Sequence, residues 1–166
     1  MSGVYERRTV CFYFVATHLG GAERSVLELI KGMARQPECG YRPVALLPKF
    51  DGALVDELKR LGVEIDVLPM PGQLLSITRK KPVLAFLSGV AAMPLVSAYL
   101  LRLRKVFDAH QPALIYSVGI KCHLLAGVIS PLVSRPVLWH LRDLLGPGPT
   151  LAALRTVGRL PWIHLA

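Results

Sequence analysis

Glycines and polar side chains follow the apolar runs of this sequence, at positions where they could bind an anion or a sugar. Gly20 and Gly21 separate the first apolar run from a helical pattern. Glycines at such a junction let backbone N–H groups approach an anion, and the start of the helix adds a partial positive charge. The alternative for this pair is a tight turn that needs a positive φ. Glu23 follows in the first helical turn, where a carboxylate also stabilises the helix dipole.

His140 ends a later apolar run and is followed closely by Arg142 and Asp143. A histidine at the carboxyl end of a strand can bond a sugar hydroxyl or act as a base, and its structural alternative is a hydrogen bond to nearby backbone. Arg142 is a candidate for binding a phosphate and Asp143 for contacting an acceptor. The alternative for these two side chains is that they pair with each other.

Two further polar positions lie at comparable junctions. Lys121 and His123 begin the helical pattern after another apolar run, and His18 follows the first run. Lys121 can meet a phosphate, although a solvated lysine is the commoner arrangement. The two interpretations given for His140, a contact with a ligand or a local hydrogen bond, also apply to His18 and His123. We include Glu23, His18 and His123 among the acceptor-side candidates.

Several kinds of chemistry have no support in the residue spacing. No Ser/His/Asp arrangement, carboxylate pair or metal-ligand set stands out, and we expect neither a metal nor a cofactor. The cysteines, Cys11, Cys39 and Cys122, are odd in number and far apart, which indicates reduced thiols. The patterns GxGxxG and GxxxxGK[ST] are absent, which disfavours an oxidoreductase that binds a dinucleotide.

The elements that position these residues alternate along the chain. Apolar, often β-branched runs predict strands at 9–16, 43–47, 63–68, 113–117 and 137–140, with a sixth beginning within 162–166. Helical spacing predicts helices at 22–35, 53–61, 81–110, 123–134 and 150–159, and Gly62 is the expected end of the second. This order predicts an α/β fold, a Rossmann-like open parallel sheet with helices on both faces. Ligands of such sheets bind beyond the carboxyl ends of the strands, where the candidates lie.

Length and charge narrow the class of protein further. The chain has 166 residues, which fits a single domain, with 20 Lys and Arg against 11 Asp and Glu for a net charge of +9. A basic surface prefers phosphorylated ligands, anionic lipid or nucleic acid. The mean hydropathy of +0.44 favours a membrane surface over nucleic acid. Residues 83–101 carry no charge, so they can form a buried helix, a helix in the membrane surface or a span.

Four ordered segments resemble the N-terminal domain of glycosyltransferase family 4, which has the GT-B architecture. They are HLGGAERSVLELIKGMARQ, with the "GG-x-E" opening, then DGALVDELKRLGVEIDVLP, PALIYSVGIKCHLLAGVIS and VLWHLRD. The resemblance runs over essentially the whole chain. The "GG-x-E" motif is weak alone, and the order of all four segments makes the resemblance specific.

The resemblance implies two facing Rossmann-like domains, with a nucleotide-sugar bound by the second domain and a glycan or lipid-linked acceptor by the first. It places Gly20 and Gly21 near the donor diphosphate, His140 near the transferred sugar and Lys121 at the same cleft. It also implies catalysis without a metal. Many members attach to membranes through a basic, apolar N-terminal domain.

The chain departs from the family in its length, because such enzymes need about twice as many residues. We therefore expect residues 1–166 to be one N-terminal domain without a donor-binding domain, which would be supplied in cis or in trans. Such a domain is expected to be inactive alone and to lie in the cytoplasm, at the inner face of the membrane. The alternative is a non-catalytic module of the same fold that binds a membrane surface or a partner.

Overall fold

The computed structural model describes residues 7–72, 93–141 and 148–165. Within them, six parallel strands form one sheet in the order β3-β2-β1-β4-β5-β6. The strands are β1 (Arg8–Phe14), β2 (Tyr41–Leu47), β3 (Glu64–Val67), β4 (Leu114–Val118), β5 (Val137–His140) and β6 (Ile163–Leu165). The predicted α/β fold with an open parallel sheet is confirmed.

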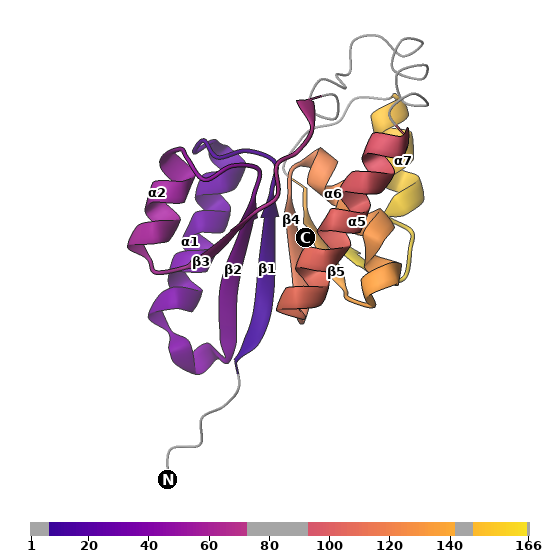
Figure 1. The fold of residues 1–166 in the computed structure, drawn as a ribbon. Helices are drawn as coiled ribbons and strands as arrows, with labels where there is room; N and C mark the ends of the chain where they lie inside the picture. The colour runs from indigo at the N-terminus through magenta and orange to yellow at the C-terminus, as the bar shows by residue number, and fades with distance from the viewer. Residues whose placement is uncertain (1–6, 73–92, 142–147, 166) are drawn as a thin grey trace.

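Helices cover both faces of this sheet. They are α1 (Gly21–Arg35), α2 (Ala53–Arg60), α5 (Met93–His110), α6 (Ile120–Val133) and α7 (Pro149–Val157), and a short 3-10 helix, η1 (Pro37–Cys39), follows α1. Figure 1 shows α1 and α2 on one side of the sheet and α5, α6 and α7 on the other. Right-handed crossovers between parallel strands produce this three-layer arrangement.

Strand β1 lies in the middle of the sheet and supplies side chains to two cores. Phe12 and Phe14 pack against α1 and α2, whereas Cys11 and Tyr13 belong to the cluster under α5, α6 and α7. All four side chains are almost completely buried. Alternation along a strand buried on both faces explains why this segment reads as a continuous apolar run.

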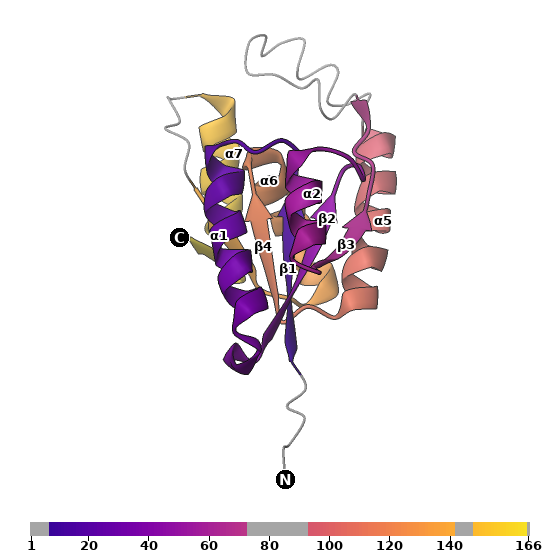
Figure 2. The ribbon, with the colours of Figure 1, turned by 90° about the vertical axis from the view of Figure 1, so that its left-hand side faces the viewer.

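The carboxyl ends of the strands meet at one end of the molecule. In Figure 2 this is the upper end, opposite the N-terminus, and the loops that lead into α1 and α2 lie there. The predicted end of α2 is confirmed, since Gly62 has a φ of 65° directly after the helix. Helix α6 begins at Ile120, three residues before the predicted start.

The uncharged segment 83–101 is described only in part, because residues 83–92 lie outside the described residues. The remainder forms the first half of α5, which buries Tyr99, Leu103 and Phe107 against the sheet. Among the helices of the described part of the chain, none has the length and apolar character that crossing a membrane requires.

Candidate functional site at the centre of the sheet

The order of the strands reverses between β1 and β4. From β1 the chain turns to one side of the sheet through β2 and β3, and β4 then starts the other side. The loops after β1 and β4 consequently lead to helices on opposite faces, α1 and α6. In open α/β sheets this switch point is where ligands bind. We use "switch-point site" for Gly20, Gly21, Glu23, Gly119 and Lys121, which follow these two strands.

Close backbone contacts hold the two loops in place. The carbonyl of Thr17 accepts a hydrogen bond of 3.0 Å from the N–H of Leu54 in α2. Gly52 is required nearby, because its φ is 114° and a Cβ there would lie 2.6 Å from the Thr17 oxygen. Gly119 has a φ of 89°, and a Cβ there would lie 3.0 Å from Cγ1 of Val15. The loop after β4 therefore touches the loop after β1.

Both helices at the switch point have a glycine as N-cap, Gly20 for α1 and Gly119 for α6, and neither has a side-chain cap. The first helical hydrogen bonds are Arg24 N–H to Gly20 C=O and His123 N–H to Gly119 C=O, both 3.0 Å. Gly20 has a φ of −79° and a ψ of −173°, so the alternative of a positive-φ turn is wrong for this pair. Two helix starts at one edge give two positive dipole ends, which suits an anion or a polar ligand.

Glu23 lies in this site and is almost fully buried. Only 9% of the residue is exposed. Its Oε2 would lie 2.6 Å from a Cβ on Gly20, and Nε2 of the exposed His18 would lie 3.5 Å from the same point. The carboxylate thus curls back over the N-cap of α1, with the imidazole of His18 close by.

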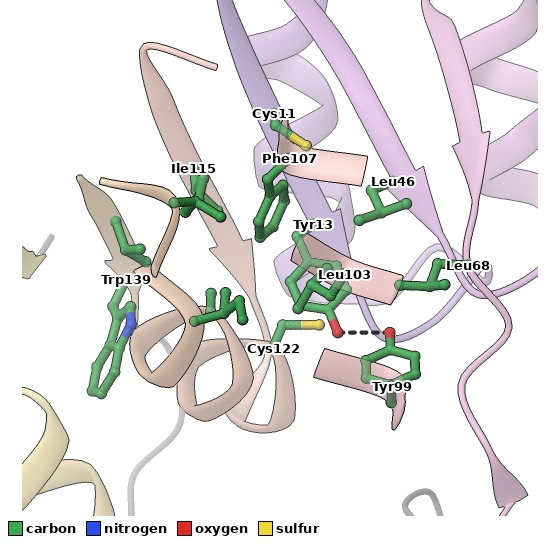
Figure 3. Packing of buried hydrophobic residues seen from close by; sticks show 14 of the residues in the cluster. Cys11, Tyr13, Leu46, Leu68, Tyr99, Leu103, Phe107, Ile115, Cys122 and Trp139 are labelled. Carbon is green, nitrogen blue, oxygen red and sulfur yellow. Dashed lines mark hydrogen bonds between the residues drawn. The ribbon is translucent and has the colours of Figure 1, made fainter. Parts of the chain in front are cut away.

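Opposite Glu23, the first turn of α6 carries Lys121 and Cys122. Burial raises the pKa of the Cys122 thiol well above its ordinary value, and the negative charge of Glu23 raises it further. Burial lowers the pKa of Lys121. Figure 3 shows the Cys122 thiol beside the hydroxyls of Tyr13 and Tyr99, which are hydrogen-bonded at 2.8 Å. The charges of Glu23 and Lys121 thus both influence this buried thiol.

His140 ends β5, the strand next to β4. Its Nδ1 lies 2.8 Å from the hydroxyl of Tyr116, and the two rings are perpendicular at 5.9 Å. Tyr116 in turn packs on Phe12 with a ring separation of 5.1 Å. The hydroxyl of Tyr116 therefore helps to orient this side chain, which remains partly exposed.

His123 lies in the core, 1% exposed. The hydroxyl of Ser117 donates to the carbonyl of Leu138 at 3.2 Å, so it accepts the 2.8 Å hydrogen bond from Nδ1–H of His123. The imidazole also stacks on Trp139 at 5.4 Å. These contacts join α6 to the sheet, and they leave His123 almost no surface with which to meet an acceptor.

The structure thus brings together some of the predicted residues and separates others. Gly20, Gly21, Glu23 and Lys121 meet at the switch point, with His18 beside them and His140 on the neighbouring strand. Arg142 and Asp143 lie outside the described residues. A hollow of about 470 Å³ adjoins Gly21 and runs along α1.

Sequence reasoning missed Gly119 and Tyr116. The signal for Gly119 was present, because it stands directly between a strand and a helix, as Gly20 does. The contact of Tyr116 with His140 depends on pairing of β4 with β5, in which Val118 lies opposite His140. No local sequence pattern predicts a contact between residues on two neighbouring strands.

Among known proteins, no family model and no curated sequence matches this chain, whereas several solved structures do. HepE of Anabaena, determined with UDP and glucose, is 19% identical with a TM-score of 0.62, over 92% of this chain and 35% of that one. MurG of Acinetobacter baumannii is 18% identical with a TM-score of 0.61, over 96% and 41%. A glycosyltransferase of Rickettsia africae is 11% identical with a TM-score of 0.61, over 97% and 37%.

The fold is that of one Rossmann-like domain of a GT-B glycosyltransferase. Similarity at this level of identity establishes the fold and leaves the reaction to be tested. The chain spans only 35% of the length of HepE and 41% of the length of MurG. The switch-point site lies at the end of this domain where the loops after the strands project.

Proposed function

We propose that this chain is the acceptor-side domain of a glycosyltransferase, which transfers a sugar from a nucleotide-sugar to a glycan or lipid-linked acceptor. A second, donor-binding domain, in cis or in trans, would complete the cleft, and residues 1–166 alone would be inactive. The proposal gives Gly20, Gly21 and Lys121 contact with the donor phosphates. It places His140 next to the transferred sugar.

The observation that carries this proposal is the convergence of α1 and α6. Each helix has a glycine as N-cap at the same edge of the sheet, so N–H groups and dipole ends of both are directed there. Lys121 adds a cation in the first turn of α6. The structures of HepE with UDP support the choice of a nucleotide diphosphate as ligand.

Titration of the chain with UDP, followed by amide NMR, tests this proposal. We expect shifts at Gly20, Gly21, Gly119 and Lys121, because phosphate oxygens accept hydrogen bonds from helix-start N–H groups. Uridine should shift these signals much less, and added salt should weaken the binding of UDP.

Lys121→Gln should reduce the affinity for UDP severalfold, by removing a charge-assisted contact. The matched control is Lys105→Gln, at an exposed lysine of α5 outside the switch-point site. If the NMR signals of these amides do not shift at millimolar UDP, the phosphate assignment is contradicted. The same holds if the Lys121→Gln variant binds UDP as tightly as the wild type does.

We also propose that α5 contacts an anionic membrane surface, at the inner face of the membrane. Met93 and Leu101 are 57% and 61% exposed, although both are large apolar side chains. Arg102, Arg104 and Lys105 are exposed on the following turn. An apolar surface edged by cations suits anionic headgroups above acyl chains.

Co-sedimentation with vesicles of phosphatidylglycerol and phosphatidylcholine measures this contact. Leu101→Glu should abolish binding while the fold is retained, because the side chain is exposed. The control is Leu132→Glu, at a similarly exposed leucine on α6. Equal loss in both variants, or binding that does not depend on the anionic lipid, would argue against a specific role of α5.

A further inference from the structure

The Glu23 side chain is largely buried at the start of α1. The residue is 9% exposed, and none of the hydrogen bonds or salt bridges found among the described residues involves its carboxylate. Other carboxylates of the same region are exposed and paired, as Glu28 is with Lys31 at 2.8 Å. The oxygens of Glu23 are not among the buried polar atoms of the described residues, so they can still be reached from solvent, and the dipole of α1 favours their negative charge.

The position of this carboxylate links it to the switch-point site. Oε2 lies over Gly20, where a Cβ would come within 2.6 Å of it. The charge also acts on the thiol of Cys122 in the first turn of α6. Glu23 therefore lies over the start of α1, and the missing side chain at position 20 leaves the space that its carboxylate occupies.

The chemistry of a carboxylate limits what can bind there. An ionised carboxylate only accepts hydrogen bonds, so its partner must bring an O–H or N–H group or be a metal ion. In residues 7–72, 93–141 and 148–165 no three His, Cys, Asp or Glu side chains are placed to hold a metal. A phosphate at the same point would be repelled. A sugar hydroxyl, by contrast, is a neutral donor that can approach two positive helix starts.

We infer that Glu23 is a specificity-determining residue that accepts a hydrogen bond from a sugar hydroxyl at the switch-point site. The inference rests on the proposed function, in which the phosphates contact N–H groups at the helix starts and the sugar lies deeper. The hydroxyl belongs either to the transferred sugar of the donor or to the acceptor. Both present the same chemistry to the carboxylate.

The test compares Glu23→Gln with the wild-type chain in calorimetric titrations and thermal melts. The probes are UDP, UDP-glucose, UDP-galactose, and the methyl glycosides of glucose and galactose. The matched control is Glu64→Gln, the same change at an exposed carboxylate at the opposite end of the sheet. We expect Glu23→Gln to lose about tenfold or more in affinity for a sugar-bearing probe, to bind UDP unchanged, and to melt no lower than the wild type.

The pattern of losses identifies the source of the hydroxyl. Loss confined to the UDP-sugars assigns Glu23 to the donor sugar, and loss confined to the glycosides assigns it to the acceptor. A Glu23→Gln variant that melts lower but binds every probe like the wild type would overturn the inference, because the carboxylate would then serve only the helix.

The outcomes for the wild type separate this inference from the proposed function. If UDP binds and an attached sugar adds nothing, the inference fails and the proposed function stands. If a glycoside binds and UDP does not, Glu23 contacts the acceptor, and the assignment of the donor phosphates to Gly20, Gly21 and Lys121 fails. If no probe binds, the inference and this phosphate assignment are both overturned.

Discussion

The two faces of the sheet are packed with different kinds of side chains. Toward α1 and α2 the core is largely aliphatic and aromatic, with Phe12, Phe14 and Leu58 fully buried. Toward α5, α6 and α7 the core also holds the hydroxyl pair of Tyr13 and Tyr99 (Figure 3).

The second face buries still more polar groups. His123 is hydrogen-bonded to Ser117 there, and the thiol of Cys122 lies nearby. The indole N–H of Trp139 is buried and finds no hydrogen-bond acceptor among the described residues, which costs about 1–3 kcal/mol. The first face is thus stabilised mainly by apolar burial, whereas the second adds hydrogen bonds that fix how α5 and α6 pack on the sheet.

The largest effect should come from the apolar face. Phe12→Ala should lower the free energy of unfolding by about 3–5 kcal/mol, because it leaves a cavity among residues that are fully buried. Urea denaturation measures this loss. The control is Phe50→Ala, since Phe50 is 55% exposed under Lys59 and its loss should cost less than about 1 kcal/mol. Similar losses in the two variants would refute the assignment of Phe12 to the main core.

On the polar face a buried side chain should matter less than Phe12 does. His123→Leu keeps an apolar contact with Trp139 but removes the hydrogen bond to Ser117, which should cost about 1–3 kcal/mol. Thermal melts measure the change, with His164→Leu as an exposed control on β6. A loss as large as that of Phe12→Ala would erase the difference between the faces.

The hydroxyl pair should have a smaller effect with a distinct pH dependence. Tyr13→Phe and Tyr99→Phe should each cost about 1 kcal/mol, and the double variant less than both together, because the second change removes a partner already lost. Burial raises the pKa of both hydroxyls above their ordinary value of 10. The unfolded chain therefore releases protons first, and stability falls as the pH rises through about 10. The double variant should lose less over that range, and equal losses would contradict the burial of the pair.

The smallest effects should come from the outer surfaces of the helices. Lys31 pairs with Glu28 on α1 at 2.8 Å and Arg104 with Asp108 on α5 at 3.3 Å, and all four groups are at least partly exposed. Glu28→Gln and Asp108→Asn should each change the free energy of unfolding by less than about 0.5 kcal/mol. Urea denaturation measures both values. If one variant loses clearly more than this, the difference between the two faces extends to the outer surfaces of their helices.

The sequence was a good guide to the framework of the fold. Strand β5 has the predicted bounds, because its apolar run ends in a partly exposed histidine that begins a loop. Strand β2 begins at Tyr41, two residues before its prediction, since parallel pairing with β1 continues past Pro43. Helix α6 also starts early, because Gly119 ends the strand with a positive φ and no capping residue marks the change.

For the candidate site the sequence located the junctions but not the contacts. Gly20, Gly21 and Lys121 were predictable because each directly follows a strand or begins a helix. The burial of Glu23 and the core position of His123 were not, because both depend on the approach of α1 and α6 across the sheet. His140 was predicted to bond a sugar hydroxyl, to act as a base or to bond the backbone. Its contact with Tyr116 was not predictable, because Tyr116 lies 24 positions away in the sequence.

The outer strand β3 has a consequence for handling the protein. It is four residues long, forms one border of the sheet and carries the charges of Glu64 and Asp66. A short, charged border offers few backbone groups in register to a strand from another molecule. The domain should therefore resist ordered self-association along β3, even though its interior strands are among the most apolar stretches of the chain.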